Sequence, residues 1–213
     1  MHKRINFFIG CIILLLFVTV SCNTHIKDEP NYLKWMNNPK NGLFVKKLSG
    51  DKELVLKYLQ PEYLSYNNLK DNKNFKSFDS LVAIYKQSPA FLLTIKNIGE
   101  AEDQDIMYEG VGDYAQYSSK VLTASFDMAG NIKLRTNSGQ TYSPVSVKME
   151  DTYSLLKQRN FYILFSTTGN ELFENCTTWD IEYDDELFNS GIHHFIFDVK
   201  NINKKIFLDF VKL

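Results

Sequence analysis

Three carboxylates alternate with large apolar side chains in residues 179–185, which read Trp-Asp-Ile-Glu-Tyr-Asp-Asp. Successive side chains of a β-strand point to opposite faces, so Asp180, Glu182 and Asp184 share one face at a spacing of about 6.5–7 Å. Such carboxylates are candidate calcium ligands, or candidate acid and base groups of a hydrolase. One strand cannot surround an ion, however, and the alternative is a hydrated acidic face above an aromatic core face.

The same strand and an early tryptophan supply candidate binding residues. Trp179 and Tyr183 face away from the carboxylates, and Trp35 stands in a polar N-terminal stretch. Exposed aromatic rings at these positions would suit a glycan or peptide ligand. Burial of the tryptophans would argue against that interpretation.

Other patterns that carry chemistry are absent from the sequence. His193 and His194 are adjacent, so on a regular strand they point to opposite faces and cannot bind one metal ion together. No Cys or His pair has zinc-ligand spacing, and no serine stands in a Gly-x-Ser-x-Gly elbow. Gly110-Val111-Gly112 lacks the third glycine of a phosphate loop and indicates a turn. We therefore expect no metal, no cofactor and no enzymatic activity.

The composition describes an ordered globular chain. Of 213 residues, 44% are hydrophobic and 14% aromatic, and the net charge is −1. Nucleic-acid binders concentrate basic residues on one face, and nothing here indicates such a partner. We expect Cys176 to be a small buried hydrophobe, because no cysteine is left to pair with it once Cys11 and Cys22 are assigned as described below.

The elements that position these residues follow from periodicity. Residues 43–48 and 53–59 flank Ser49–Lys52 and predict a β-hairpin. Ser77 is a candidate N-cap for a helix that buries one face, made of Phe78, Leu81, Val82 and Tyr85.

Asp113 followed by Gln116 resembles a capping box and predicts a second helix, which continues to about Phe126. We expect this helix to bury Tyr114, Tyr117 and Val121. Gly130 is expected to end the second helix.

Strands dominate the second half of the predicted fold. We expect strands at residues 90–96, 132–135, 141–149, 161–165, 178–183, 194–199 and 206–211. Pro144 would mark an edge or a bulge in the strand over 141–149. A loop is expected at 67–76 and a short helical connection at 150–159. Ile196 and Leu208 are expected in the core. The pattern predicts a β-rich α+β fold, an antiparallel β-sandwich with two or three helices packed on one side.

The first 22 residues resemble the signal of bacterial lipoproteins. Lys3 and Arg4 precede an apolar run from Phe7 to Val20, which is short for a membrane span and is followed by Ser21-Cys22. In that family the cysteine thiol receives diacylglycerol, the chain is cut before the cysteine, and the new amine is acylated too. Thr19 stands where the family most often has Leu, a looser pattern similar to that of Bacteroidetes. The resemblance implies lipidation at Cys22 and removal of residues 1–21, leaving about 190 residues.

The resemblance also implies an address. Asn23 is not the Asp that resembles an inner-membrane retention signal, so the outer membrane is expected. Lys27-Asp28-Glu29 resembles the export motif of Bacteroidetes surface lipoproteins and favours the cell surface over the periplasmic face, although a charged tether would look the same. We expect a lipidated tether over 22–41, in which Trp35 and Met36 are possible anchors, and one globular domain over 42–213 with a possible subdivision near 130.

Three functions remain open from the sequence. The first is a non-enzymatic envelope lipoprotein that binds another envelope protein, as an accessory of an assembly. The second is a surface lipoprotein that binds a glycan or peptide, with its ligand unknown. The third is a hydrolase that uses the carboxylates of Asp180, Glu182 or Asp184.

Overall fold

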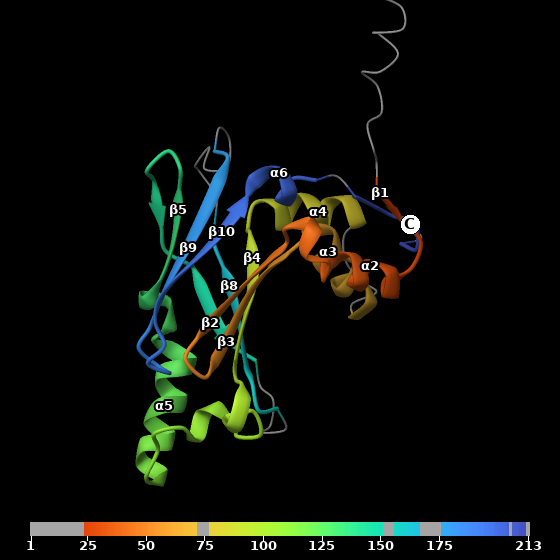
Figure 1. Ribbon diagram of the computed structural model, residues 1–213. Helices are drawn as coiled ribbons and strands as arrows, with labels where there is room; N and C mark the ends of the chain where they lie inside the picture. The colour runs from red at the N-terminus through yellow and green to blue at the C-terminus, as the bar shows by residue number, and fades with distance from the viewer. Residues whose placement is uncertain (1–23, 72–76, 151–155, 167–175, 205, 212–213) are drawn as a thin grey trace, which may run out of the picture.

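The computed structural model describes residues 24–71, 77–150, 156–166, 176–204 and 206–211, and two antiparallel sheets form its centre (Figure 1). The five-stranded sheet has the order β2 (Phe44–Ser49), β3 (Lys52–Leu59), β4 (Ala90–Asn97), β8 (Arg159–Leu164) and β7 (Ser146–Met149). The four-stranded sheet has the order β10 (Gly191–Asp198), β9 (Thr178–Asp185), β5 (Ile132–Thr136) and β6 (Thr141–Tyr142). A parallel pair joins β1 (Thr24–Ile26) to β11 (Ile206–Leu208).

Helices lie at the two ends of the sheets. They are α2 (Glu29–Met36), α3 (Pro61–Asp71), α4 (Phe78–Lys86), α5 (Tyr114–Phe126) and α6 (Val199–Ile202), with 3-10 turns at Pro39–Asn41, Gly99–Ala101, Ile106–Tyr108 and Met128–Asn131. In Figure 1, α2, α3 and α4 gather near β1, and α5 stands at the opposite end. No helix in these described residues is long and apolar enough to cross a membrane.

The two sheets pack face to face through aromatic side chains. The Phe91 ring of β4 lies 6.3 Å from Trp179 of β9 and 5.4 Å from Phe197 of β10, measured between ring centroids. At the edge, the Ser49 hydroxyl donates a 2.9 Å hydrogen bond to the Ser190 carbonyl, which joins β2 to the β9–β10 turn. The predicted β-rich α+β sandwich is confirmed. Because β4 pairs with β8, strands from both sides of residue 130 share one sheet, and the fold does not divide there.

Local sequence patterns placed several elements correctly. The hairpin of β2 and β3, the apolar strand β4 and the helix α4 with Ser77 as N-cap all occur as predicted. The predicted strand over 141–149 is instead two strands in different sheets. Pro144 has no N–H to continue a ladder, and Val145 N–H bonds to the Leu164 carbonyl at 2.8 Å, which starts β7 in the five-stranded sheet.

The predicted tether differs from the structure from residue 24 onward. Asp28 caps α2 by accepting from the Asn31 N–H at 2.8 Å, and Pro30 stands in the first turn of the helix. Tyr32 is fully buried in the core and Met36 nearly so. Part of the predicted tether is therefore an amphipathic helix, and its two buried side chains lie four residues apart in a stretch of polar composition.

Four further expectations were wrong. The loop predicted at 67–76 overlaps the helix α3, which begins at Pro61 and continues to Asp71. Tyr114 is 82% exposed instead of buried, whereas α5 ends at Phe126 as expected and Gly130 lies in the 3-10 turn that follows. Ile196 is 60% exposed, because Phe195 and Phe197 face the core instead. The last predicted strand ends at Leu208, which is half-buried against the core.

The connection predicted at 150–159 falls partly on residues 151–155, outside the described residues. Residues 156–158 are not helical, and β8 begins at Arg159.

Candidate functional site

An apolar pocket of 740 Å³ lies where α4, α6 and β11 meet the end of the sandwich. Its most deeply buried residues are Tyr58, Trp179, Ile202 and Ile206. Phe78 and Val82 of α4 and Phe207 and Leu208 of β11 form its sides. Ligand sites typically enclose about 300–1,000 Å³ and are mainly apolar with a few polar groups, so this pocket has the size and lining of one.

Local sequence features bring these walls together. Ser77 starts α4, and the spacing of Phe78 and Val82 puts both side chains on one helix face. Pro61 opens α3, and Pro89 directly precedes β4. The C-terminal strand β11 closes the far side, held to β1 by the parallel pairing and by the His25 ring, which stacks on Phe207 with 4.9 Å between centroids.

Tyr58 is a polar residue of the pocket lining, together with the half-buried Glu62 and the exposed Asn203. Tyr58 is 5% exposed, and its ring meets Trp179 edge to face at a centroid distance of 6.2 Å. In the part of the chain that the structure describes, no group makes a hydrogen bond with its hydroxyl. Burial, with the negative charge of Glu62, raises the pKa of Tyr58 well above the ordinary 10.0. The hydroxyl therefore stays protonated and can donate to a ligand.

Charged side chains of both signs stand at the pocket rim. Lys86 and Lys204 supply positive charge, and Asp79 and Asp209 supply negative charge. All four are exposed to water. Asp209 is paired with His25 at 3.0 Å. The site thus combines a mainly apolar lining, the Tyr58 hydroxyl as a donor, the half-buried Glu62 carboxylate and a mouth with charges of both signs.

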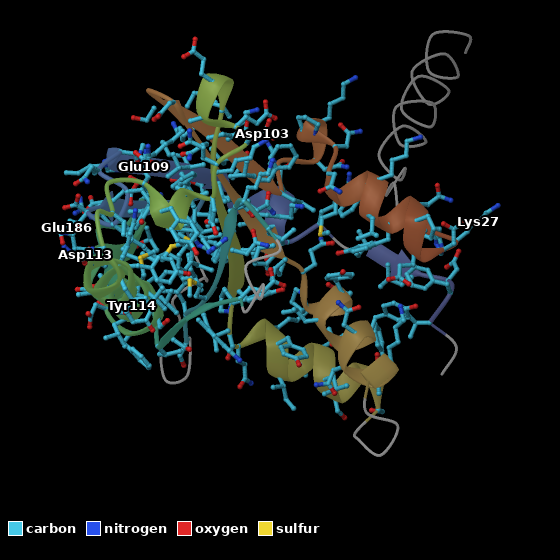
Figure 2. All side chains as sticks on the ribbon, turned by 90° about the horizontal axis from the view of Figure 1, so that it is seen from below. Lys27, Asp103, Glu109, Asp113, Tyr114 and Glu186 are labelled. Atoms are coloured by element: carbon cyan, nitrogen blue, oxygen red, sulfur yellow. The ribbon has the colours of Figure 1, made fainter. Side chains whose placement is uncertain are left out.

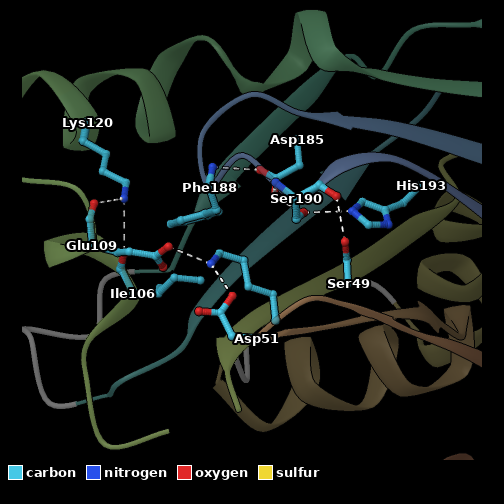
Figure 3. Close-up of polar contacts among 10 residues, drawn as sticks. Ser49, Asp51, Ile106, Glu109, Lys120, Asp185, Phe188, Ser190 and His193 are labelled. Carbon is cyan, nitrogen blue, oxygen red and sulfur yellow. Dashed lines mark hydrogen bonds and ion pairs between the residues drawn. The ribbon is translucent and has the colours of Figure 1, made fainter. Parts of the chain in front are cut away.

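A second group of polar side chains surrounds the β9–β10 turn (Figure 3). Asp185 is 1% exposed and accepts hydrogen bonds from the Tyr183 hydroxyl at 2.7 Å, from the Phe188 N–H at 3.0 Å and from the Ser190 hydroxyl. The Ser190 hydroxyl also contacts His193 Nε2 at 2.8 Å. Burial lowers the pKa of His193 below the ordinary 6.5, although the Asp185 carboxylate opposes the shift.

This group has the residue types of a serine hydrolase in the wrong order. In a catalytic triad the histidine stands between the serine and the carboxylate. Here Ser190 stands between Asp185 and His193, and the carboxylate is occupied by donors of its own turn. The arrangement holds the β9–β10 connection, in which Asn189 has a positive φ of 55°.

The polar contacts continue towards α5. Lys52 is 4% exposed and pairs with Glu109 at 2.7 Å and with Asp51 at 2.9 Å. Burial alone would lower the pKa of Lys52, but these hydrogen bonds raise it above the ordinary value. Lys120 donates to the Ile106 and Glu109 carbonyls at 3.1 and 2.9 Å. These contacts fasten the segment between β4 and α5 over the end of the sandwich.

The candidate aromatic residues are placed inside the fold. Trp179 and Tyr183 are 2% and 1% exposed, so neither offers a surface for a glycan. Trp179 instead lines the pocket, and its Nε1–H donates to Cys176 Sγ at 3.1 Å. Trp35 is half-buried, with Lys204 Nζ 5.9 Å from its ring centroid. Cys176 is buried, as predicted.

The candidate carboxylates lie on the outer face of the four-stranded sheet. Asp180 pairs with His194 Nδ1 at 2.9 Å, and Glu182 pairs with Arg135 at 2.8 Å. Asp184 lies opposite Ile192 in the strand register. They do not converge on a cavity. Among the described residues, no group of three or more His, Cys, Asp or Glu side chains could hold a metal ion.

The N-terminal candidates are only partly within the described residues. Cys22 lies outside them. Asp28 is the N-cap of α2, and Glu29 binds Lys70 Nζ at 3.1 Å and the Tyr66 hydroxyl at 3.1 Å. Both acidic residues of the Lys27-Asp28-Glu29 motif therefore have structural contacts.

No protein-family model matches the chain, and no curated protein sequence matches it either. A crystal structure of a protein of unknown function from Burkholderia pseudomallei is 11% identical, with a TM-score of 0.36, over 80% of this chain and 85% of that chain. A DUF4426 family protein from Pseudomonas aeruginosa is 9% identical, with a TM-score of 0.34, over 78% of this chain and 96% of that chain. No function follows from similarity at this level.

Sequence reasoning missed the pocket. Its residues run from Tyr58 to Val211 and come together only in the folded chain. The helix pattern after Ser77 and the strand near residue 206 were recognised, but nothing in the sequence indicates that they face each other across a space.

Proposed function

We propose that this protein is a non-enzymatic envelope lipoprotein, anchored through acylated Cys22, that holds a small and mainly apolar ligand in the pocket beneath Tyr58. The observation that carries the proposal is the 740 Å³ pocket with its mainly apolar lining, to which Tyr58 contributes a hydroxyl that has no partner among the described residues. A ligand oxygen that accepts a hydrogen bond from this hydroxyl would add about 0.5–1.5 kcal/mol to the binding free energy.

The anchor is part of the same proposal. Ser21-Cys22 after an apolar run supports lipidation, and two or more acyl chains on one cysteine give stable attachment to a bilayer. We place the protein at the outer membrane because Asn23 is not an acidic retention residue. The Lys27-Asp28-Glu29 motif, although short, favours display at the cell surface over the periplasmic face. Protease treatment of intact cells distinguishes these two locations.

The test compares ligand content between two tryptophan variants. Val82→Trp fills the pocket from α4, whereas Val145→Trp adds the same side chain at a 62% exposed position outside it. The wild-type lipoprotein and both variants are extracted from membranes in mild detergent, and bound small molecules are quantified by mass spectrometry. We expect one compound that is near-stoichiometric in wild type and Val145→Trp and depleted in Val82→Trp. Equal recovery of every compound from all three proteins would contradict the proposal.

A second candidate function is docking of another envelope protein on α5. Tyr114, Leu122 and Phe126 are 82%, 56% and 76% exposed, and Leu122 and Phe126 share one helix face. Asp113 and Asp127 stand at the two ends of α5, which favours a partner groove with a basic rim. Figure 2 shows Asp113 and Tyr114 beside Glu109 and Glu186 on one side of the molecule, with Lys27 on the other.

Crosslinking in cells tests this second candidate. A photoreactive residue at position 122 should capture one defined partner, and Phe126→Asp should abolish the capture while the fold and the pocket ligand are retained. Unchanged capture by Phe126→Asp would remove α5 from consideration.

A further inference from the structure

The pocket and the lipid anchor are close together in the fold. Ile206, Phe207 and Leu208 form one side of the pocket, and each of them pairs in parallel with a residue of β1, from Thr24 to Ile26. Neighbouring strands lie about 4.8 Å apart. The strand that leads directly to Cys22 is thus one strand spacing from the pocket wall.

Chain length limits how far the anchor can be. Thr24 is two residues after Cys22, and an extended chain spans at most about 3.5 Å per residue, so the two Cα atoms are within about 7 Å of each other. With Cys22 acylated, the β1–β11 edge must remain near the bilayer surface. The far end of the molecule, where α5 lies, points away from β1 (Figure 1).

The chemistry of the pocket fits a hydrocarbon chain that carries an oxygen. Trp179, Ile202 and Ile206 offer only apolar contact surface in its deep part, because the Trp179 N–H is already bonded to Cys176 Sγ. Each buried CH₂ group of a ligand contributes about 0.8 kcal/mol. Tyr58 can donate a hydrogen bond to one carbonyl or hydroxyl oxygen of the ligand, and Glu62 and Asn203 also line the pocket.

The rim fits the polar part of the same ligand. Lys86 and Lys204 stand at the mouth with Asp79 and Asp209, and all are in water. Side chains of both signs can meet a charged or zwitterionic head group without desolvating it.

We infer that the pocket takes an acyl chain, drawn from the membrane beside it, whose carbonyl or hydroxyl oxygen accepts a hydrogen bond from Tyr58. This inference rests on the proposed function and names the class of its ligand. Three sources have this chemistry: a membrane phospholipid, a free fatty acid, and a chain attached to Cys22 itself.

Photocrosslinking from a bilayer tests the inference. The full lipoprotein is reconstituted into vesicles of phosphatidylethanolamine and phosphatidylglycerol that contain a trace of phospholipid with a diazirine in one acyl chain. After illumination and digestion, mass spectrometry locates the label. We expect label on peptides that contain residues 78–86 and 206–211, reduced about ten-fold or more in Val82→Trp, where the space is filled, and unchanged in Val145→Trp.

Two further arms separate the sources. Free diazirine fatty acid added to unlabelled vesicles should label the same peptides if the ligand is a fatty acid. Protein from cells fed the diazirine fatty acid, purified into unlabelled vesicles, should show a crosslink between the Cys22 peptide and the pocket peptides if its own chain is the occupant. Positive results in any arm support the acyl class, and their pattern names the source.

Tyr58→Phe keeps the test decisive if Val82→Trp does not fold. Loss of the one hydrogen bond should lower the labelling yield about two- to ten-fold without removing any apolar wall. Label confined to surface residues of β1 and α2, or an equal yield in wild type, Val82→Trp and Tyr58→Phe, would overturn the inference. A non-acyl compound retained by wild type and lost from Val82→Trp would overturn it too, while leaving the proposed function intact.

Discussion

The Tyr32 hydroxyl donates a 2.7 Å hydrogen bond to Oε1 of Gln60, and both side chains are buried. This contact fixes α2 to the junction of β3 and α3, directly beside the pocket. Two positions from Gln60, Tyr58 is 5% exposed, and its hydroxyl has no partner among the described residues. The same functional group is thus structural at one position and available to a ligand at the other.

Removal of these two hydroxyls should have opposite consequences. Tyr32→Phe leaves the buried Gln60 oxygen without its donor, so we expect the free energy of unfolding to fall by about 1–3 kcal/mol. Tyr58→Phe breaks no hydrogen bond in the ligand-free protein, so its stability should stay within about 0.5 kcal/mol of wild type or rise. Urea unfolding measures both. A loss for Tyr58→Phe as large as for Tyr32→Phe would mean that Tyr58 has a structural partner.

Asp185 should be essential to the β9–β10 turn. Its carboxylate receives hydrogen bonds from Tyr183, Phe188 and Ser190, so Asp185→Ala leaves several buried donors unpaired. We expect a loss of about 3–5 kcal/mol in urea unfolding. Asp184→Ala is the matched control on the outer face and should change stability by no more than about 0.5 kcal/mol. Similar losses for the two variants would show that the Asp185 contacts have no special weight.

His193 should make stability fall in mild acid. Its pKa is lowered in the folded state by burial, so the unfolded chain binds more protons as the pH falls past the ordinary value of 6.5. The associated stability is therefore present above about pH 6.5 and is lost as the pH falls towards the folded-state pKa. His193→Gln should flatten this dependence between about pH 7 and pH 5. An identical pH profile for His193→Gln would assign the acid sensitivity elsewhere.

Cys22 should determine membrane attachment. We expect Cys22→Ala to leave the membrane fraction or to accumulate as an unprocessed precursor, because no acyl chains can then be added. Fractionation and metabolic labelling with palmitate check this, and Cys176→Ala is the control that removes a cysteine without touching the signal. Palmitate incorporation into Cys22→Ala would contradict the anchor.

Elements with strong local patterns could be predicted from the sequence. The alternation in residues 53–59 and the apolar spacing after Ser77 each specify an element with little help from the rest of the chain. The α2 helix could not be recognised in the same way, because Tyr32 and Met36 are its only buried side chains and Leu33 and Trp35 pack only partly against the core.

Two features were harder to predict: which face of a strand is buried, and which elements meet in the folded chain. In β10 the run Phe195-Ile196-Phe197 is apolar at every position, so periodicity does not say which side is buried. The pairing of β9 with β5 and β10 decides it, and Ile196 then faces water. The pocket is lined by residues of β3, α4 and β11, and the meeting of such distant segments leaves no signature in one sequence.

Native mass spectrometry of the wild-type lipoprotein, released directly from its membrane, tests the central claim most directly. We expect a second mass peak above the acylated chain that corresponds to one bound amphiphile, present in wild type and Val145→Trp and absent from Val82→Trp. A single acylated species in all three proteins, with no bound molecule at any detergent concentration that preserves the fold, would contradict it.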